Sequence, residues 1–258
     1  MVKSAERVAT LITVLAGSSK GLLFSELEHQ LDLPKSSLHA LLDTLVATKM
    51  VSCEKESKRY RLGPLVWEAA MAFSRNLQLV PIAVPHLDRL RTTLGETVQM
   101  AILDGSDIVY IAKSESQRPI QLVSAVGSRL PAHATGLGKA LLACLPGERL
   151  QDLYPNSEAL VPLSPNTIRS GDALRRDLGE TRARGYAIDA GECTPGLYCI
   201  ATPVLGMDHK ALAAISVSVP ESRLTPEEQS HLASELIKEA HALSRKLGAL
   251  NPSSWTSS

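Results

Sequence analysis

The sequence predicts an α+β protein of two domains, a small helical domain with a two-stranded hairpin and a larger domain built on one antiparallel sheet. The chain has 258 residues, more than a typical single domain. Residues 1–63 hold three short helical patterns and a basic hairpin, whereas strand-like alternation begins near Thr97. We therefore expect a domain over 1–63, a linker helix over 64–79, a second domain over 80–250 and a flexible tail over 251–258.

The first two helices are marked by an apolar stripe and by their start signals. The first stripe repeats at i, i+3, i+4 and i+7 and consists of Val8, Leu11, Ile12 and Leu15. Gly17 and Gly21 interrupt this pattern. Ser25 and Glu28, three residues apart, predict a capping box at the start of the second helix.

The third helix is predicted to begin near Pro34, which suits a first turn. Its buried stripe consists of Leu38, Leu41, Leu42 and Leu45. The opposite side carries Lys35, Ser36, Ser37, His39, Ala40 and Asp43. A short hairpin follows over 50–63, in which Tyr60 and Leu62 are expected to face inward and Arg59 and Arg61 outward.

Three short helices followed by a basic hairpin are typical of a winged helix-turn-helix. Polar residues near the start of the third helix can reach base edges or phosphates of double-stranded DNA; these are Lys35, Ser36, Ser37 and His39. The wing offers cations for phosphate contacts, namely Lys55, Lys58, Arg59 and Arg61. Residues 1–63 hold nine Lys/Arg against seven Asp/Glu, so local placement and not net charge supports DNA binding. The alternative is a protein-interaction module with a solvated hairpin.

The larger domain begins with helices and continues with strands. We expect helices over 64–76 and 81–93 and strands over 97–103, 108–112 and 120–126, with a hairpin turn at Asp104-Gly105-Ser106-Asp107. Further helices are expected over 139–145, 148–153 and 172–184, strands over 186–189, 198–204 and 211–219, and a long helix over 226–247. Strands in two groups separated by helices indicate an α+β domain.

Composition excludes several classes of protein. No apolar run approaches the roughly 20 residues that span a bilayer, and the first residues lack the pattern of a signal peptide. Four scattered cysteines argue against a disulfide framework, so we expect a cytoplasmic protein. No cofactor is expected, and the spacing of Cys193 and Cys199 does not fit common zinc motifs.

Six segments of the chain resemble the IclR family of bacterial transcription regulators. The DNA-binding half is similar in SAERVATLITVLAG, FSELEHQLDLPKSSLHALLDTLV and KRYRLGPLV. The second half is similar in AVGSRLPAHATGLGKALLA, RARGYAIDAGECTPGLYCIATPV and AAISVSVP. The resemblance implies a GAF-like effector-binding domain and a homodimer or homotetramer. Two positions depart from the family: Ala40 stands where Arg is usual on the recognition helix, and Lys49 stands where Gly is usual at its exit.

Several residues predict a small-molecule site in the second domain. The run Thr135-Gly136-Leu137-Gly138 leads into a helix whose N-terminus favours an anion. Ser216 and Ser218 alternate to one face of the last strand, while Asp189 and Cys199 bracket a loop. The resemblance implies that a small organic acid binds at Gly136, Leu137, Asp189, Cys199, Ser216 and Ser218. It also implies that Leu122, Leu130 and Leu197 line the apolar side.

Each of these residues also has an ordinary structural interpretation, as a turn glycine, a core cysteine or a helix cap. An enzyme is a further alternative, in which Cys193 or Cys199 would act with His133 and Asp189. No G-x-S-x-G motif or P-loop supports catalysis. The sequence therefore favours a regulator that binds operator DNA and a small organic-acid effector, not a membrane protein. Activator and repressor, and dimer and tetramer, remain open at this point.

Overall fold

The computed structural model divides by its internal contacts into two compact units, Met1–Gln78 and Leu79–Ser258. It describes residues 2–31, 33–77, 79–116, 125–155, 159–253 and 255. The helix expected as a separate linker is counted with the first unit. The finer boundaries at 63, 79 and 250 stay predictions.

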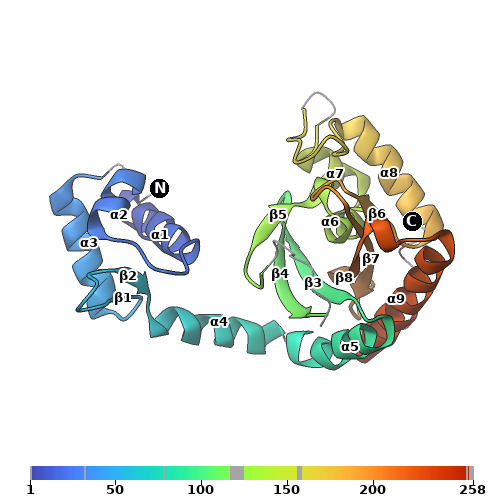
Figure 1. The fold of residues 1–258 in the computed structure, drawn as a ribbon, viewed down its shortest axis with the longest axis horizontal. Helices are drawn as coiled ribbons and strands as arrows, with labels where there is room; N and C mark the ends of the chain where they lie inside the picture. The colour runs from blue at the N-terminus through green and yellow to red at the C-terminus, as the bar shows by residue number, and fades with distance from the viewer. Residues whose placement is uncertain are drawn as a thin grey trace. The chain divides into compact units, whose positions relative to one another are not determined.

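The N-terminal unit has the element order predicted for a winged helix-turn-helix (Figure 1). Its elements are α1 (Lys3–Ala16), α2 (Phe24–Leu31), α3 (Lys35–Ala47), β1 (Val51–Cys53), β2 (Tyr60–Leu62) and α4 (Pro64–Leu77). The buried core is mostly leucine and consists of Leu11, Leu15, Leu27, Leu38, Leu42, Leu45 and Val51. These residues are the inner stripes of the three helices together with the first wing strand, so the apolar pattern predicted the fold of this unit.

The start of α2 differs from the expected capping box. Phe24 is the first helical residue, so Ser25 lies inside the first turn. Glu26 occupies the third position, and its Oε2 accepts the backbone N–H of Leu23 at 2.6 Å. This is the side-chain half of a capping box, placed by Glu26 instead of Glu28. The predicted pair of Ser25 and Glu28 is wrong.

The C-terminal unit contains one antiparallel sheet, as predicted. Within the described residues its six strands follow the order β5-β4-β3-β8-β7-β6. Its elements are α5 (Leu79–Leu94), β3 (Thr97–Asp104), β4 (Asp107–Ser114), β5 (Arg129–Pro131), α6 (Gly136–Leu142), α7 (Gly147–Leu153), α8 (Gly171–Arg184), β6 (Ala187–Ala190), β7 (Leu197–Leu205), β8 (Ala211–Pro220) and α9 (Pro226–Lys246). The expected turn at Asp104-Gly105-Ser106-Asp107 joins β3 to β4, with Asp104 paired to Asp107.

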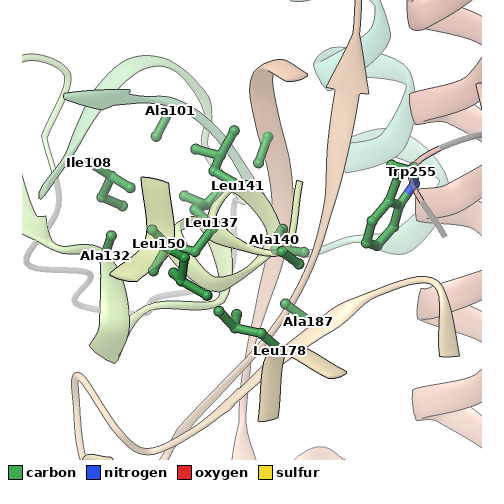
Figure 2. Packing of buried hydrophobic residues seen from close by; sticks show 14 of the residues in the cluster. Ala101, Ile108, Ala132, Leu137, Ala140, Leu141, Leu150, Leu178, Ala187 and Trp255 are labelled. Carbon is green, nitrogen blue, oxygen red and sulfur yellow. The ribbon is translucent and has the colours of Figure 1, made fainter. Parts of the chain in front are cut away.

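Helices cover both faces of this sheet and make a three-layer unit. One core cluster joins the sheet to α5 and α9 through residues such as Leu87, Ile215 and Leu236. The other joins it to α6, α7 and α8 through residues such as Ala214 and Leu141 (Figures 1 and 2). Because side chains alternate along a strand, β8 sends Ile215 and Val217 to the first cluster and Ala214, Ser216 and Ser218 toward α6.

Two expectations about irregular segments have different outcomes. The strand expected over 120–126 lies mostly on residues 117–124, outside the described residues, and the strand next to β4 is β5, with Leu130 opposite Ile108. The tail over 251–258 was expected to be loose. Trp255 instead is 5% exposed and packs in the cluster that holds Leu137 and Leu141 (Figure 2). The other tryptophan, Trp67 on α4, is 66% exposed.

Candidate functional site

Helix α3 presents a polar N-terminal half above a buried leucine stripe. Lys35, Ser36, His39 and Ala40 are exposed and Ser37 is half-buried, whereas Leu38, Leu42 and Leu45 are buried. The His39 ring stacks on Phe24 of α2, with ring centroids 4.2 Å apart. This contact fixes the direction of an exposed imidazole beside the start of the helix. The surface has the composition with which a recognition helix contacts a DNA groove.

The basic residues of the wing fall into two groups, one exposed to solvent and one bonded to the rest of the unit. Lys55 and Lys58 are exposed and lie at the hairpin turn. Arg59 instead turns to its own unit, where Nη1 donates to Gly21 O at 2.7 Å and to Glu26 Oε2 at 3.2 Å. Arg61 is half exposed and donates from Nε to Lys20 O at 3.3 Å. The expectation that both arginines face outward is therefore wrong for Arg59, whereas Arg61 is exposed as expected.

These arginines hold the wing against the loop between α1 and α2. Leu22 in that loop pairs with Tyr60 through two backbone hydrogen bonds of 2.9 and 2.7 Å. Glu26, which caps α2, also accepts from Arg59. One carboxylate thus ties the start of the second helix to the wing, so a change at Arg59 affects the placement of both.

The exit of α3 has the backbone conformation for which glycine is best suited. Lys49 has φ of +61°, the left-handed region. Its carbonyl accepts the N–H of Leu65 at 3.1 Å, and a Cβ at Gly63 would stand 2.2 Å from the same oxygen. Gly63 is therefore needed for close approach, while Lys49 carries the strain of a side chain at positive φ.

The second unit contains a cavity of about 300 Å³ between the sheet and α6. Its volume is at the lower end of the range for small-molecule sites. It is lined by Gln99, Tyr110, Leu130, Thr135, Gly136, Leu137, Leu163, Asp189, Cys193, Thr194, Leu197, Cys199, Ser216 and Ser218. All predicted ligand-binding residues except Leu122 thus lie around one cavity. Leu122 lies outside the described residues.

Strand register explains why distant polar residues meet here. Asp189 on β6 is opposite Cys199 on β7, and Cys199 is opposite Ser218 on β8. In the adjacent row Ser216 is opposite Gln99 on β3. Paired residues share a face of the sheet, so Asp189, Cys199 and Ser218 form one polar row beneath α6, with Ser216 and Gln99 in the row beside it. Cys199 Sγ lies 3.2 Å from Ser218 Oγ, which links two members of the row.

Helix α6 covers this row through its glycines. It begins at Gly136, earlier than the expected start at Lys139, and Thr135 caps it by accepting the N–H of Gly138 at 3.0 Å. A Cβ on Gly136 would lie 3.6 Å from Cys199 Cβ, and one on Gly138 only 2.2 Å from Ala132 O. Gly138 is thus required by packing, while Gly136 leaves the backbone open toward the polar row.

Asp189 is a buried carboxyl at the edge of this cavity. Its Oδ1 accepts the N–H of Glu192 at 2.7 Å and of Cys193 at 3.3 Å. Burial raises the pKa of Asp189 to about 7, against the lowering effect of these two N–H donors and of Lys139. The neutral carboxyl is therefore substantially populated at neutral pH, in a cavity where it can donate as well as accept a hydrogen bond.

The two cysteines of the cavity are poor nucleophiles. Burial raises the pKa of Cys193 to about 11 and that of Cys199 well above its ordinary value. His133, the base considered in the catalytic alternative, has its Nε2 3.0 Å from Val161 O and is not among the lining residues described. The arrangement fits ligand binding better than covalent catalysis.

A buried ion-pair cluster holds the loop after β6 against α6. Lys139 is 0% exposed, and its Nζ lies 2.5 Å from Glu192 Oε1 and 3.4 Å from Asp177 Oδ2 on α8. The same loop is held from the other side, because Thr167 Oγ1 donates to Glu192 O at 2.6 Å. Burial raises the pKa of Glu192, while Lys139 opposes that shift. This cluster positions the loop that brings Cys193 and Thr194 to the cavity.

Six residues of the cavity lining were not among the predicted ligand-binding residues, although Thr135 lies in the predicted loop and Cys193 was considered as a nucleophile. They are Gln99, Tyr110, Thr135, Leu163, Cys193 and Thr194. Gln99 could have been found, since a lone amide in the strand TVQMAIL is a signal for a polar neighbour. Leu163 comes from an irregular segment between α7 and α8, where no periodicity indicates a direction.

Comparisons with known proteins agree over both units. Residues 4–52 match the IclR helix-turn-helix domain, and residues 71–245 match the C-terminal domain of bacterial transcriptional regulator IclR. The HTH-type transcriptional repressor AllR of Klebsiella pneumoniae is 36% identical over 222 residues, 86% of this chain and 81% of that protein. No helix in the described part of the chain is long and apolar enough to cross a membrane.

Solved structures show the same fold. The Thermotoga maritima IclR crystal structure is similar with a TM-score of 0.77 and 28% identity, covering 96% of this chain and 100% of that one. An IclR homologue from Microbacterium hydrocarbonoxydans, complexed with 4-hydroxybenzoate, is similar in fold with a TM-score of 0.84 and 24% identity. That match covers 95% of this chain and 98% of the other. The relatives are transcriptional regulators, which leaves the catalytic alternative without support.

Proposed function

The chain belongs to the IclR family of bacterial transcriptional regulators and is a DNA-binding regulator; we propose that its second unit is the sensor that modulates operator binding. The effector is a small organic acid held in the cavity beneath α6. The observation that carries this proposal is the polar row of Asp189, Cys199 and Ser218, which crosses three strands and lines the cavity. Polar side chains that converge on a cavity of this kind fix the orientation of a bound ligand.

The proposed contacts follow from the placement of each residue in the fold. Cys199, Ser216 and Ser218 supply polar atoms, and Leu130, Leu137 and Leu197 supply apolar surface. A homologue of the same fold is complexed with 4-hydroxybenzoate, and this supports a small organic acid as the class of effector. A cavity of about 300 Å³ limits the effector to a small molecule.

The proposed DNA interface consists of the exposed half of α3 and the tip of the wing. Lys35, Ser36, Ser37, His39 and Ala40 would contact the groove, with Lys55, Lys58 and Arg61 beside the phosphates and Arg59 supporting the wing. A dimer would place two such helices on neighbouring half-sites of a roughly palindromic operator. The finer assembly, dimer or tetramer, is tested by measuring the mass of the protein in solution. We place the protein in the cytoplasm, where operator DNA is found.

The test measures binding of the full chain to duplex DNA from upstream of its own gene, in rising salt, by fluorescence anisotropy. Lys35, Lys55 and Lys58 are replaced by Ala together. The slope of log affinity against log salt should fall by about one for each of these lysines that binds a phosphate. Lys238→Ala, on α9 with a 70% exposed side chain, is the matched control and should leave the slope unchanged. Equal slopes for the triple variant and the control would contradict the proposed interface.

The sensing part is tested in the same assay. Saturating 4-hydroxybenzoate or pyruvate should change operator affinity by about 5–150-fold, the usual range of coupling between two sites. Ser216→Ala and Ser218→Ala should reduce that response without altering operator affinity in the absence of effector. Loss of operator binding in the serine variants alone would indicate a structural and not a sensing role.

A further inference from the structure

The cavity beneath α6 contains an acid but no base. Its titratable lining residues are Asp189, Cys193, Cys199 and Tyr110, and none of the described lining residues is Lys, Arg or His. A carboxylate that enters this cavity therefore meets no cation with which to form an ion pair. It must be held by hydrogen-bond donors, and an ionised Asp189 would repel it.

Lys139, the cation that lowers the pKa of Asp189, is already paired with other carboxylates. Lys139 on α6 contacts Glu192 on the loop and Asp177 on α8, so two carboxylates share one ammonium group. Cys193 on the same loop and Cys199 on β7 add no positive charge, and burial keeps both thiols protonated, with the pKa of each raised. An anionic Asp189 would thus stand beside Glu192 with two backbone N–H donors but with no cation paired to it. Of the charged groups in the described part of the chain that act on Asp189, Glu192 favours its neutral form and Lys139 opposes it.

The hydrogen bonds of Asp189 leave one oxygen for a ligand. Oδ1 accepts both N–H groups of the loop, from Glu192 and Cys193. Oδ2 takes no part in these two bonds, and Asp189 is one of the lining residues although it is only 3% exposed to solvent. In the neutral acid the proton can reside on Oδ2 while Oδ1 continues to accept from the loop.

We propose that Asp189 is the proton-carrying donor of this site: its neutral carboxyl donates a hydrogen bond from Oδ2 to the carboxylate of the effector. This inference rests on the proposed function, in which the cavity is the effector site. Where Asp189 is ionised in the empty cavity, binding takes up one proton from solvent, and no bond other than the O–H bond forms or breaks. The regulator then responds more strongly to an acidic effector as the pH falls. With Asp189 ionised, the site instead favours neutral ligands that donate, such as primary amides.

The test compares an acid with its amide by calorimetry on the full chain at pH 6.0 and pH 8.0. The probes are 4-hydroxybenzoate with 4-hydroxybenzamide, and pyruvate with pyruvamide. The pKa of Asp189 of about 7 gives an affinity for each acid that is about tenfold lower at pH 8.0 than at pH 6.0. The amides should bind equally well or better at pH 8.0. Equal affinity of an acid at the two pH values would overturn the proposal.

Two variants separate Asp189 from other titrating groups. Asp189→Asn keeps an Oδ1 acceptor for the loop and always presents an N–H donor, so its affinity for the acids should not depend on pH. Cys193→Ser should keep the tenfold dependence, because the thiol does not titrate in this range. Loss of the dependence in Cys193→Ser and its persistence in Asp189→Asn would overturn the assignment.

Two measurements on the unmodified protein keep the proposal testable if Asp189→Asn does not fold. Acid binding at pH 8.0, measured in two buffers of different ionisation enthalpy, should consume close to one proton, and zero uptake would contradict the proposal. Infrared spectra of the empty protein should contain a protonated carboxyl band at pH 6.0 that disappears above pH 7. Its absence at pH 6.0 would also overturn the proposal. If neither probe pair binds, the cavity is not an acid site, whereas the salt titration still decides DNA binding.

Discussion

The two units of the chain differ in where their candidate binding residues lie, at the surface in one and in the interior in the other. In the N-terminal unit the candidate contact residues Lys35, Lys55 and Lys58 are exposed. In the C-terminal unit Lys139 is 0% and Asp189 3% exposed. DNA is a long polyanion and binds at an exposed surface, whereas a small molecule is recognised by groups that are buried away from water. Substitutions should therefore change binding first in one unit and stability first in the other.

The buried cluster at Lys139 should give the largest effect. Lys139→Met leaves the buried Glu192 and the half-buried Asp177 without this cation and should lower the free energy of unfolding by about 3–5 kcal/mol. Lys238→Met removes an exposed pair with Glu235 and should cost less than about 1 kcal/mol. Urea denaturation monitored by circular dichroism measures both. Similar losses of unfolding free energy in the two variants would contradict the expected difference between buried and exposed charges.

Two helical glycines should respond in opposite directions to the same change. Gly138→Ala brings a Cβ to 2.2 Å from Ala132 O, a backbone atom, and should destabilise the protein by about 1–3 kcal/mol. At Gly179 on α8 no atom lies within 4 Å of an added Cβ, so Gly179→Ala should stabilise by about 0.5–1 kcal/mol. Thermal unfolding of the two variants checks the sign, and stabilisation by both would refute the close packing of α6.

Arg59 tests the contrast between surface and interior groups, because this basic wing residue forms its hydrogen bonds within the N-terminal unit. Arg59→Ala removes the bonds to Gly21 and Glu26 and should lower the free energy of unfolding by about 1 kcal/mol. Lys55→Ala should leave stability within about 0.5 kcal/mol of the unmodified protein. Both should weaken operator binding. If Arg59→Ala reduced only the salt slope and not stability, Arg59 would be a DNA contact instead of a support.

Much of the fold follows from apolar periodicity, and the exceptions have physical causes. The leucine stripes of the first three helices were predicted because helical spacing alone places them on one face. The start of α2 was misplaced because Ser25 and Glu26 both offer capping groups, and only the path of the chain decides which is used. Trp255 was misjudged because its neighbours in the sequence are polar, although a large aromatic ring gains much from burial in a core.

The sequence predicted most residues of the candidate site, but it did not predict how they are arranged in space. Ser216 and Ser218 were placed on one face by strand alternation, which needs only local sequence. Their meeting with Gln99, Cys199 and Asp189 depends on strand order, which no local pattern encodes. Burial raises the pKa of Asp189, and this burial arises only from the packing of the folded chain. Its electrostatic behaviour could not have been inferred from the sequence.

The positions of Trp67 and Trp255 make the two units optically distinct. Each unit carries one of the two tryptophans, and Trp67 is 66% exposed whereas Trp255 is 5% exposed. An indole in water emits at longer wavelength than one in a hydrocarbon environment, so one emission spectrum contains two separable signals. With Trp67→Phe, the remaining fluorescence arises from the cluster that includes Leu137 of the cavity wall. Quenching by iodide would then report specifically on opening of the sensor core.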